Sequence, residues 1–199
     1  EEQEVQFYKG KPFKHEKSFT KVHTGFVNAC GFTPDGNHFL TVSQDKSLKV
    51  HNCETKEVVL EKSGVHSMGI NGFSFAEGNT IFTCSSDRTV KAHEYNLEAK
   101  TIEEKGVMNL NQFDIDGYKE NVDKQQLGVL STPDSSVFGC SFNSDINLWS
   151  QGEWRHTIRG HKNAITKLTM FKDLLVSADN DGRLLIWNND SIATRPVGL

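Results

Sequence analysis

Serine, histidine and aspartate recur together along this chain of 199 residues, and these three side chains can support nucleophilic catalysis. A hydrolase needs one serine on an exposed, strained turn, next to a mobile base and an oxyanion hole. The segment 139–143, GCSFN, comes near the G-x-S-x-G pattern of such a turn. It ends on asparagine, however, and runs on into a strand-like segment instead of a helix. A hydrolase is therefore kept only as an alternative, and no catalytic residue is assigned.

The spacing of these residues indicates a repeat instead. The stretches 22–52, 65–94 and 160–188 share one plan: a histidine, an alternating apolar run, a turn, a second apolar run, a tight turn with aspartate, and a third apolar run. A ring side chain follows each turn aspartate by six residues, and a fourth copy at 135–150 has asparagine in the place of the aspartate. Successive copies lie roughly 40 to 55 residues apart, which is near the length of a four-stranded propeller blade.

The elements that would position these residues are strands. Alternating apolar residues and β-branched or aromatic side chains predict strands throughout, and no segment keeps a helical period over three turns. The sequence therefore predicts an all-β fold of about four and a half four-stranded antiparallel propeller blades in an incomplete ring. The expected divisions are the second half of a blade with a linker strand at 1–20, and further blades at 21–62, 63–105, 106–158 (with a polar insertion at 108–124) and 159–199.

The repeats resemble the WD-repeat family, in which the turn aspartate bonds a histidine between strands and the ring bonds a serine or threonine two residues before the aspartate. The resemblance implies a structural network in each blade that satisfies its buried polar turn. The third copy lacks the histidine, with Asp123 near its place, and in the last copy Asp179 replaces the serine, so that network must be wired differently. The network residues implied are His23, Ser43, Asp45 and His51; His66, Ser85, Asp87 and His93; Ser141, Asn143 and Trp149; and His161, Asp179, Asp181 and Trp187.

Charge and cysteine content narrow the class of protein. The formal net charge of −4 comes from interspersed acidic and basic residues, so neither nucleic acid nor an anionic membrane is expected as a partner. No apolar run approaches the roughly 20 residues that span a bilayer, and no signal peptide precedes the charged start. The four cysteines form no C-x-x-C pair, which favours free thiols in a reducing, cytosolic setting.

The eight histidines do not predict a metal site. Three belong to the expected networks and two stand at ring positions, while His15, His38 and His156 have no close partner in the sequence. No phosphate-binding loop or dinucleotide fingerprint occurs. We expect neither a metal nor a cofactor.

Segments between the repeats resemble the actin-interacting protein 1 family. Residues 7–19, FYKGKPFKHEKSF, are similar to its F-x-G-P-P-F-K-F linker strand, and FVN and PDGN runs follow in the family's order. DKQQLGVL at 123–130 resembles its DQQLG segment, and GHKNAIT at 160–166, followed by SADNDG, is a third landmark. The departures point to a divergent relative: Lys11 replaces the first proline, His15 an aromatic residue, and His51 and His93 the usual rings.

This resemblance implies two joined seven-bladed propellers, the second opening with the repeat at Gly160. It also implies a non-enzymatic, cytoplasmic protein of the actin cytoskeleton that binds actin filaments with ADF/cofilin and promotes their disassembly. The alternative is a generic WD-repeat scaffold for another cytoplasmic complex.

Aromatic residues beside basic ones are typical interface anchors. We therefore expect partner binding in the linker, at Tyr8, Lys9, Lys11, Phe13 and Phe19. The alternative is that Phe13 and Phe19 pack an outer strand. Because an incomplete ring would expose apolar blade faces and strand edges, an isolated fragment is expected to self-associate.

Overall fold

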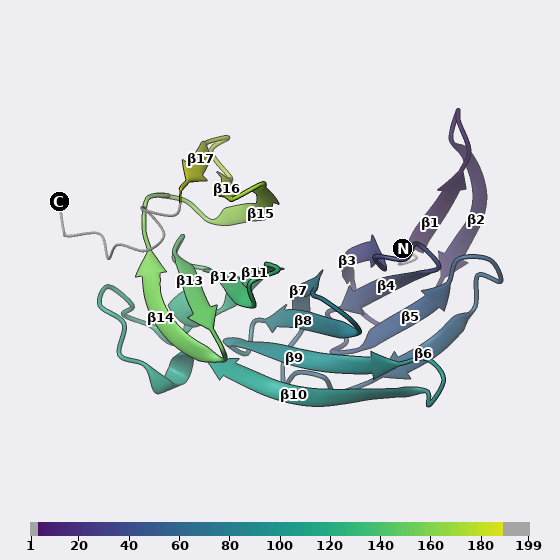
Figure 1. The fold of residues 1–199 in the computed structure, drawn as a ribbon, viewed down its shortest axis with the longest axis horizontal. Helices are drawn as coiled ribbons and strands as arrows, with labels where there is room; N and C mark the ends of the chain where they lie inside the picture. Colours follow the sequence, from purple (N-terminus) through teal and green to yellow (C-terminus); the bar gives the residue numbers. More distant parts are fainter. Residues whose placement is uncertain (1–3, 189–199) are drawn as a thin grey trace. The chain divides into compact units, whose positions relative to one another are not determined.

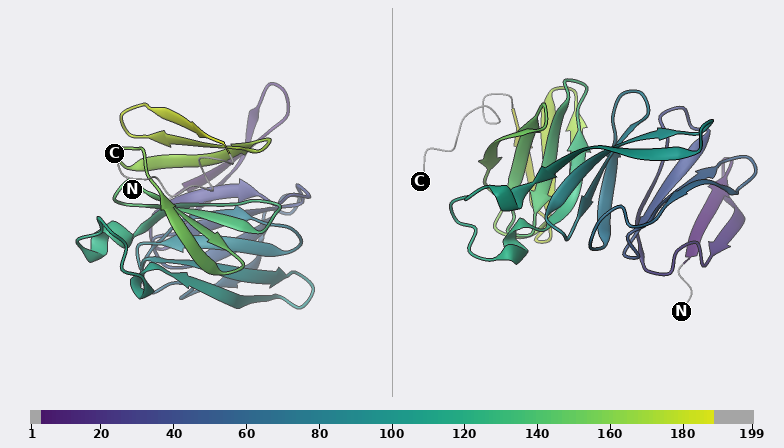
Figure 2. Two further views of the ribbon diagram at one scale, coloured as in Figure 1. Left: turned by 60° about the vertical axis from the view of Figure 1, so that its left-hand side comes forward. Right: turned by 90° about the horizontal axis from the view of Figure 1, so that it is seen from below.

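The computed structural model describes residues 4–188, and these residues form an almost entirely β structure. The chain divides into two compact units. The first contains the residues up to Ile70 together with Asn96–Ile102, and the second contains Asn71–Tyr95 together with the residues from Glu103 onward. Figures 1 and 2 show the strands of each sheet running side by side in chain order.

The first unit holds a two-stranded hairpin and a four-stranded antiparallel sheet. The hairpin consists of β1 (Glu4–Lys9) and β2 (Lys14–Thr20). The sheet has the order β3-β4-β5-β6, with strands β3 (Val27–Phe32), β4 (His38–Ser43), β5 (Leu48–Asn52) and β6 (Val58–Lys62).

A second four-stranded sheet lies mostly in the second unit and has the order β10-β9-β8-β7. Its strands are β7 (Ile70–Phe75), β8 (Thr80–Ser85), β9 (Thr89–Asn96) and β10 (Thr101–Asn109). The polar insertion follows and contains two short 3-10 helices, η1 (Leu110–Gln112) and η2 (Asn121–Lys124).

Two further sheets complete the second unit. The first is β11 (Gln126–Ser131), β12 (Ser136–Ser141), β13 (Ile146–Ser150) and β14 (Glu153–Ile158). The last is β15 (Ile165–Phe171), β16 (Leu174–Asp179) and β17 (Leu184–Trp187). The fourth strand expected for this sheet falls on 189–199, outside the described residues. The prediction of an all-β chain of antiparallel blades is confirmed, while the blade boundaries stay a prediction.

Within the second unit, apolar side chains of a sheet's third strand pack on the first strands of the following sheet. In the second unit, Ile146 and Leu148 of β13 are buried with Ile165, Leu168 and Leu175 of the last sheet. This burial removes apolar surface from water, which is the main favourable contribution to folding.

The last sheet differs at the same register positions. Leu184 and Ile186 of β17, which correspond to Ile146 and Leu148, are 70% and 67% exposed, against 1% and 9%. The last sheet therefore presents an open apolar face, as expected from the sequence, and self-association through such a face stays a prediction. Among residues 4–188, none of the helices is long and apolar enough to cross a membrane.

The tight turn between the second and third strands is built the same way in all four sheets. Its closing hydrogen bond runs from the N–H of Lys46, Arg88, Ser144 or Gly182 to a carbonyl three residues earlier. These four residues have φ between 70° and 79°, the left-handed region that favours glycine. Two of the turns therefore hold a long cationic side chain in a conformation that suits glycine better.

Substitutions at this turn position should change stability in opposite directions, depending on whether they introduce or remove glycine. Lys46→Gly should raise the free energy of unfolding by up to about 1 kcal/mol, because it relieves left-handed strain at some cost in chain entropy. Gly182→Ala should lower it by about 1 kcal/mol, since a Cβ there meets no atom within 4 Å and only the backbone conformation opposes it. Urea unfolding measures both.

Lys167→Gly, an exposed lysine within β15, is the matched control and should lower stability by about 0.5–1 kcal/mol. If Lys46→Gly destabilises the protein as much as Lys167→Gly does, the turn position carries no left-handed strain.

Candidate functional site

In the first unit, a buried series of hydrogen bonds connects a histidine, a threonine and the side chain at the ring position, six residues after the turn aspartate. His23 lies before β3 and is 4% exposed. Its Nδ1 is 3.1 Å from Asp45 Oδ2, and its Nε2 is 2.8 Å from Thr41 Oγ1. Thr41 Oγ1 in turn lies 3.0 Å from Nε2 of His51, the ring residue of β5. These hydrogen bonds therefore connect the segment before β3 with both β4 and β5.

Asp45 organises the tight turn through its carboxylate. It accepts hydrogen bonds from Thr24 N (2.8 Å), Ser47 N (2.9 Å) and Ser47 Oγ (2.6 Å). Although burial raises the pKa of Asp45, these hydrogen bonds and the charge of His23 bring it down to about 2. Burial is the largest influence on His23 and lowers its pKa despite the neighbouring carboxylate.

The second four-stranded sheet repeats this turn. Thr83 Oγ1 is 3.0 Å from Nε2 of His93, and Asp87 accepts from Thr89 N (3.1 Å) and Thr89 Oγ1 (2.6 Å). Both ring-position histidines are buried, His51 at 1% and His93 at 0% exposure. The structure thus places His23, Asp45, His51, Asp87 and His93 in packed structural positions; His66 is likewise buried.

The hydroxyl that reaches the ring differs from the prediction. It belongs to Thr41 and Thr83, ten residues before the ring, instead of Ser43 and Ser85. Register explains the difference: Phe39 pairs with His51, so Thr41 lies two residues from the level of the ring, whereas Ser43 lies beyond the last β4–β5 pair. The two serines accept the N–H of Asp45 and Asp87 within the turn, at 3.1 Å each. The ten-residue spacing was the sequence signal for the correct hydroxyl.

The hydrogen-bond network of the last sheet differs from the others, as the aspartate at position 179 predicts. His161 Nδ1 is 2.7 Å from Asp179 Oδ2, and its Nε2 is 2.6 Å from Ser177 Oγ. Trp187 Nε1 donates to the same hydroxyl at 2.8 Å. The histidine partner is therefore Asp179 at the end of β16, and the expected partner Asp181 instead accepts a hydrogen bond from Asn163.

The third complete sheet, β11-β12-β13-β14, has no histidine in its network. Residues from other parts of the chain take part instead. Ser141 Oγ hydrogen-bonds with Tyr118 Oη (3.1 Å), Gln126 Nε2 (3.0 Å) and Asn147 Nδ2 (2.6 Å). Gly139 stands ten residues before Trp149, where the other sheets have the hydroxyl. Trp149 Nε1 accordingly has no hydrogen-bond partner among residues 4–188.

Gln126 occupies the space next to Gly139. A Cβ at position 139 would lie 2.4 Å from Gln126 Oε1, so glycine at this position is what admits the glutamine side chain. The other predicted residues do not join the centre of the network. Asn143 donates to Asp145 at 2.9 Å, and Asp123 accepts the N–H groups of Lys119 and Glu120.

Arg159, which follows β14, connects this sheet to the insertion. The side chain of Arg159 is 39% exposed; its Nε lies 3.3 Å from Oδ2 of the buried Asp145, and it also donates to the carbonyl of Asp116 in the insertion. Burial raises the pKa of Asp145 despite the guanidinium. Burial, followed by the negative charge of Asp145, raises the pKa of Tyr118 to about 12, so the phenol stays protonated and able to donate.

None of the predicted serines has the geometry of a nucleophile. Ser43, Ser85 and Ser141 are fully buried, and Ser141 ends β12 with its hydroxyl inside the network. A catalytic serine requires an exposed turn, and GCSFN does not provide one here. Within residues 4–188, no group of three or more His, Cys, Asp or Glu side chains is placed to hold a metal ion.

The linker, residues 7–19, contains the turn of the β1–β2 hairpin. The predicted binding residues within it fall into an exposed group and a buried one. Tyr8 and Phe13 are 49% and 72% exposed, and Lys9 and Lys11 beside them are also exposed. Phe19 is only 8% exposed, because its ring packs edge-on against Phe39 and His51 with centroids 5.5 and 5.8 Å away. Phe19 is therefore a packing residue, whereas the other four residues form an exposed basic and aromatic hairpin turn.

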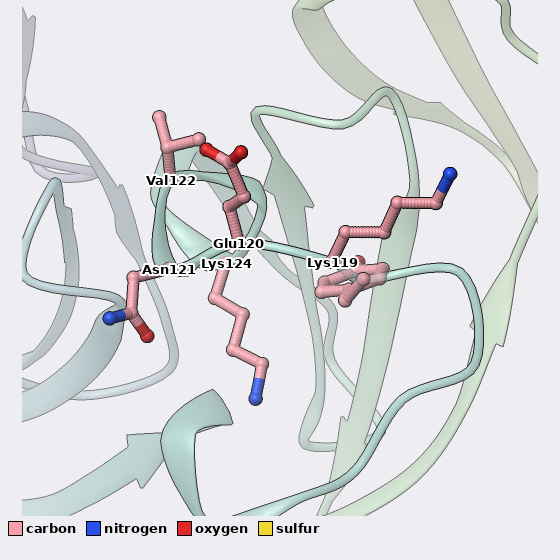
Figure 3. Close-up of a pocket in the computed structure, with 6 residues that line it drawn as sticks. Lys119, Glu120, Asn121, Val122 and Lys124 are labelled. Atoms are coloured by element: carbon pink, nitrogen blue, oxygen red, sulfur yellow. The ribbon is translucent and has the colours of Figure 1, made fainter.

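The insertion also bears a concavity of about 500 Å³. Figure 3 shows its side chains pointing in different directions, with the ammonium groups of Lys119 and Lys124 far from a common centre. Lys124 Nζ is already used, since it donates to the carbonyl of Phe113 at 2.9 Å. All lining residues come from the one segment 118–124, so the concavity gathers no chemistry from other elements.

Comparisons with known proteins agree with this repeat geometry. The family model described as "WD domain, G-beta repeat" matches residues 14–52 and 152–188, and each match runs from the last strand of one sheet through three strands of the next. WD repeat-containing protein 1 of Gallus gallus is 29% identical over 194 residues, covering 93% of this chain and 30% of the relative.

Two further relatives match. The 66 kDa stress protein of Physarum polycephalum is 34% identical over 205 residues, covering 99% of this chain and 32% of the relative. Actin-interacting protein 1-2 of Arabidopsis thaliana is 44% identical over 59 residues, covering 30% of this chain and 10% of the relative. The chain spans about a third of the length of the two relatives that it matches along nearly all its residues.

Loss of the buried hydroxyl should destabilise the protein. Thr41→Ala removes the group between His23 and His51 and should lower the free energy of unfolding by about 1–3 kcal/mol, whereas Thr41→Ser should retain most of it. Denaturant unfolding measures the difference. Thr20→Ala, at an exposed strand position, should stay within about 0.5 kcal/mol of the original, and equal effects at both positions would contradict the network.

Stability should fall as the pH falls from about 6.5 to about 4. Burial lowers the pKa of His51 to about 4, so in this window the unfolded chain binds a proton that the folded chain refuses. The loss attributable to His51 should reach at most about 3 kcal/mol.

His51→Trp removes this titrating group and places at the ring position the residue that occupies it in the last sheet. Unfolding measured between pH 7 and pH 4.5 should be less pH-dependent in the variant, and this range lies above the window in which Asp45 titrates. Identical slopes in the two proteins would show that His51 is not held neutral by burial.

Proposed function

Because this chain is a WD-repeat protein related to WD repeat-containing protein 1 and to actin-interacting protein 1, we propose that it binds actin filaments and acts with ADF/cofilin to promote their disassembly. The match along 93% of the chain to WD repeat-containing protein 1 supports a WD-repeat scaffold. The observation that carries the actin proposal is the 44% identity over 59 residues to a relative whose name states interaction with actin. The linker and the DQQLG-like segment add the resemblance to the same family.

The proposed contact is the exposed turn of the β1–β2 hairpin. Tyr8, Lys9, Lys11 and Phe13 combine two aromatic rings with two ammonium groups, and 72% of Phe13 faces solvent. Large aromatic side chains bury much area at low entropic cost, and lysines steer association with an acidic surface. The rest of the hairpin holds this turn in place, since Phe7 and Phe19 pack on Phe39 of the adjoining sheet.

The proposed action is binding without covalent chemistry. The serines that a hydrolase would use are buried parts of the sheets, so the polar residues of the repeats serve stability. Filament disassembly by a binding protein requires a higher affinity for the cofilin-altered filament than for the bare filament, because a ligand shifts an equilibrium only through such a preference. The protein would act in the cytoplasm, on the actin cytoskeleton.

Co-sedimentation with filamentous actin, with and without cofilin, tests this proposal. The protein should pellet with filaments at least fivefold more strongly when cofilin is present. Lys11→Glu combined with Phe13→Ala should remove most of this binding, because it takes away the exposed ring and reverses a charge of the hairpin turn.

Phe171→Ala combined with Lys172→Glu is the matched control. Phe171 is 64% exposed and is followed by a lysine at the turn after β15, so the change is chemically alike but lies outside the hairpin. Equal losses in the two double variants would remove the hairpin from the proposal. Absence of any cofilin-dependent pelleting would leave the coarser assignment, a WD-repeat scaffold for another cytoplasmic complex.

A further inference from the structure

The turn end of the β1–β2 hairpin is exposed on both faces. Every residue from 8 to 17 is exposed, although successive side chains of a strand point to opposite faces. Figure 1 shows this end extending away from the sheet β3-β4-β5-β6, which belongs to the same unit. Residues 8–15 therefore form a projecting tip, called the hairpin tip below.

The hairpin tip carries two lysines at directly paired positions. Lys9 of β1 pairs with Lys14 of β2, so both side chains lie on the same face of the hairpin. Like charges at such a position destabilise a strand pair. Lys11 adds a third ammonium group in the turn, and residues 8–15 contain no aspartate or glutamate.

No carboxylate of the described chain compensates these three lysines. Among residues 4–188, none of the three has an ion pair. Glu16, the acidic residue that follows the tip, lies 3.6 Å from Lys56 Nζ instead. The repulsion between Lys9 and Lys14 therefore persists within the chain, and an anionic surface that lies across both ammonium groups would relieve it.

A large aromatic ring stands among the lysines of the tip. Phe13 lies between Lys11 and Lys14 in the sequence, and it is 72% exposed. On a projecting tip, this ring can leave water only by entering the partner. The interface of a lipid bilayer admits such a ring at the level of the headgroups without a preformed pocket, while lysines beside the ring meet the charged headgroups.

The charge of the tip differs from the charge of the whole chain. The net charge of −4 comes from interspersed acidic and basic residues, which led us to expect no membrane partner. The potential of an anionic membrane, however, falls off within about 8 Å at physiological ionic strength, so a projecting segment experiences it more strongly than the sheets do. The local excess of three positive charges therefore decides the attraction.

We propose that the hairpin tip binds the surface of an anionic lipid membrane. Phe13 enters the headgroup region, and Lys9, Lys11 and Lys14 contact the acidic headgroups. Binding is reversible, because one ring and three lysines form a weak anchor. The inference does not depend on the actin proposal. Because the same turn is the proposed filament contact, membrane and filament would exclude each other, and only this consequence rests on the proposed function.

Flotation of the whole chain with vesicles of phosphatidylcholine and phosphatidylserine tests the proposal. The protein should float with these vesicles at low salt, float less as salt is added, and stay behind with vesicles of phosphatidylcholine alone. Phe13→Ala and Lys11→Glu should each reduce the bound fraction at least fivefold. Free glycerophosphoserine at the same headgroup concentration should not compete, since it offers no interface to the ring.

Lys9→Glu separates loss of binding from loss of folding. It places a carboxylate opposite Lys14, so it should reduce vesicle binding at least fivefold without lowering the urea midpoint. Phe171→Ala combined with Lys172→Glu is the matched control and should float as the original does. The proposal is overturned if the anionic vesicles bind no protein, if the tip variants float as the original does, if the control loses binding equally, or if glycerophosphoserine competes.

The two proposals fail separately. Actin filaments with cofilin should reduce the floating fraction if both are correct. Vesicle binding without cofilin-dependent pelleting would contradict only the proposed function, and pelleting without vesicle binding would contradict only the membrane proposal.

Discussion

The buried hydrogen bonds between histidine, hydroxyl and ring are the interaction on which the rest of the structure depends. A sheet that packs on both faces buries the residues at the edges of its tight turn, such as Ser43 and Ser47, and an unsatisfied buried polar group there costs about 1–3 kcal/mol. Asp45 and Asp179 meet this need at the turn, and His23 and His161 carry the bonds on to Thr41 and Ser177. With the turn fixed, the third strand keeps its register and presents its apolar side chains for packing.

Much of this could be predicted from the sequence, because repetition makes register visible. The six-residue spacing from aspartate to ring located the tight turns, and the alternating apolar runs located the strands. The hydroxyl was misplaced because Thr41 and Ser43 lie on the same strand two residues apart, and only the pairing of Phe39 with His51 distinguishes them. In the last sheet, the same two-residue offset separates the expected histidine partner, Asp181, from the observed one, Asp179.

The third complete sheet could not be predicted, since its network is assembled from distant parts of the chain. Tyr118 comes from the insertion, and Gln126 enters a space that exists only because residue 139 is glycine. Neither residue has a repeated spacing that could reveal it. The proposed function follows the same division: repeated positions build the scaffold, whereas the exposed hairpin turn, which the repeat does not explain, is the proposed contact with a partner.

Hydrogen exchange at the turn amides tests most directly whether these polar side chains are structural. The N–H groups of Ser47 and Thr89, which donate to Asp45 and Asp87, should exchange as slowly as the central amides of β4 and β8, through unfolding of the whole sheet. Exchange as fast as that of Gly36, which donates to Thr33 in the turn between β3 and β4, would contradict the account.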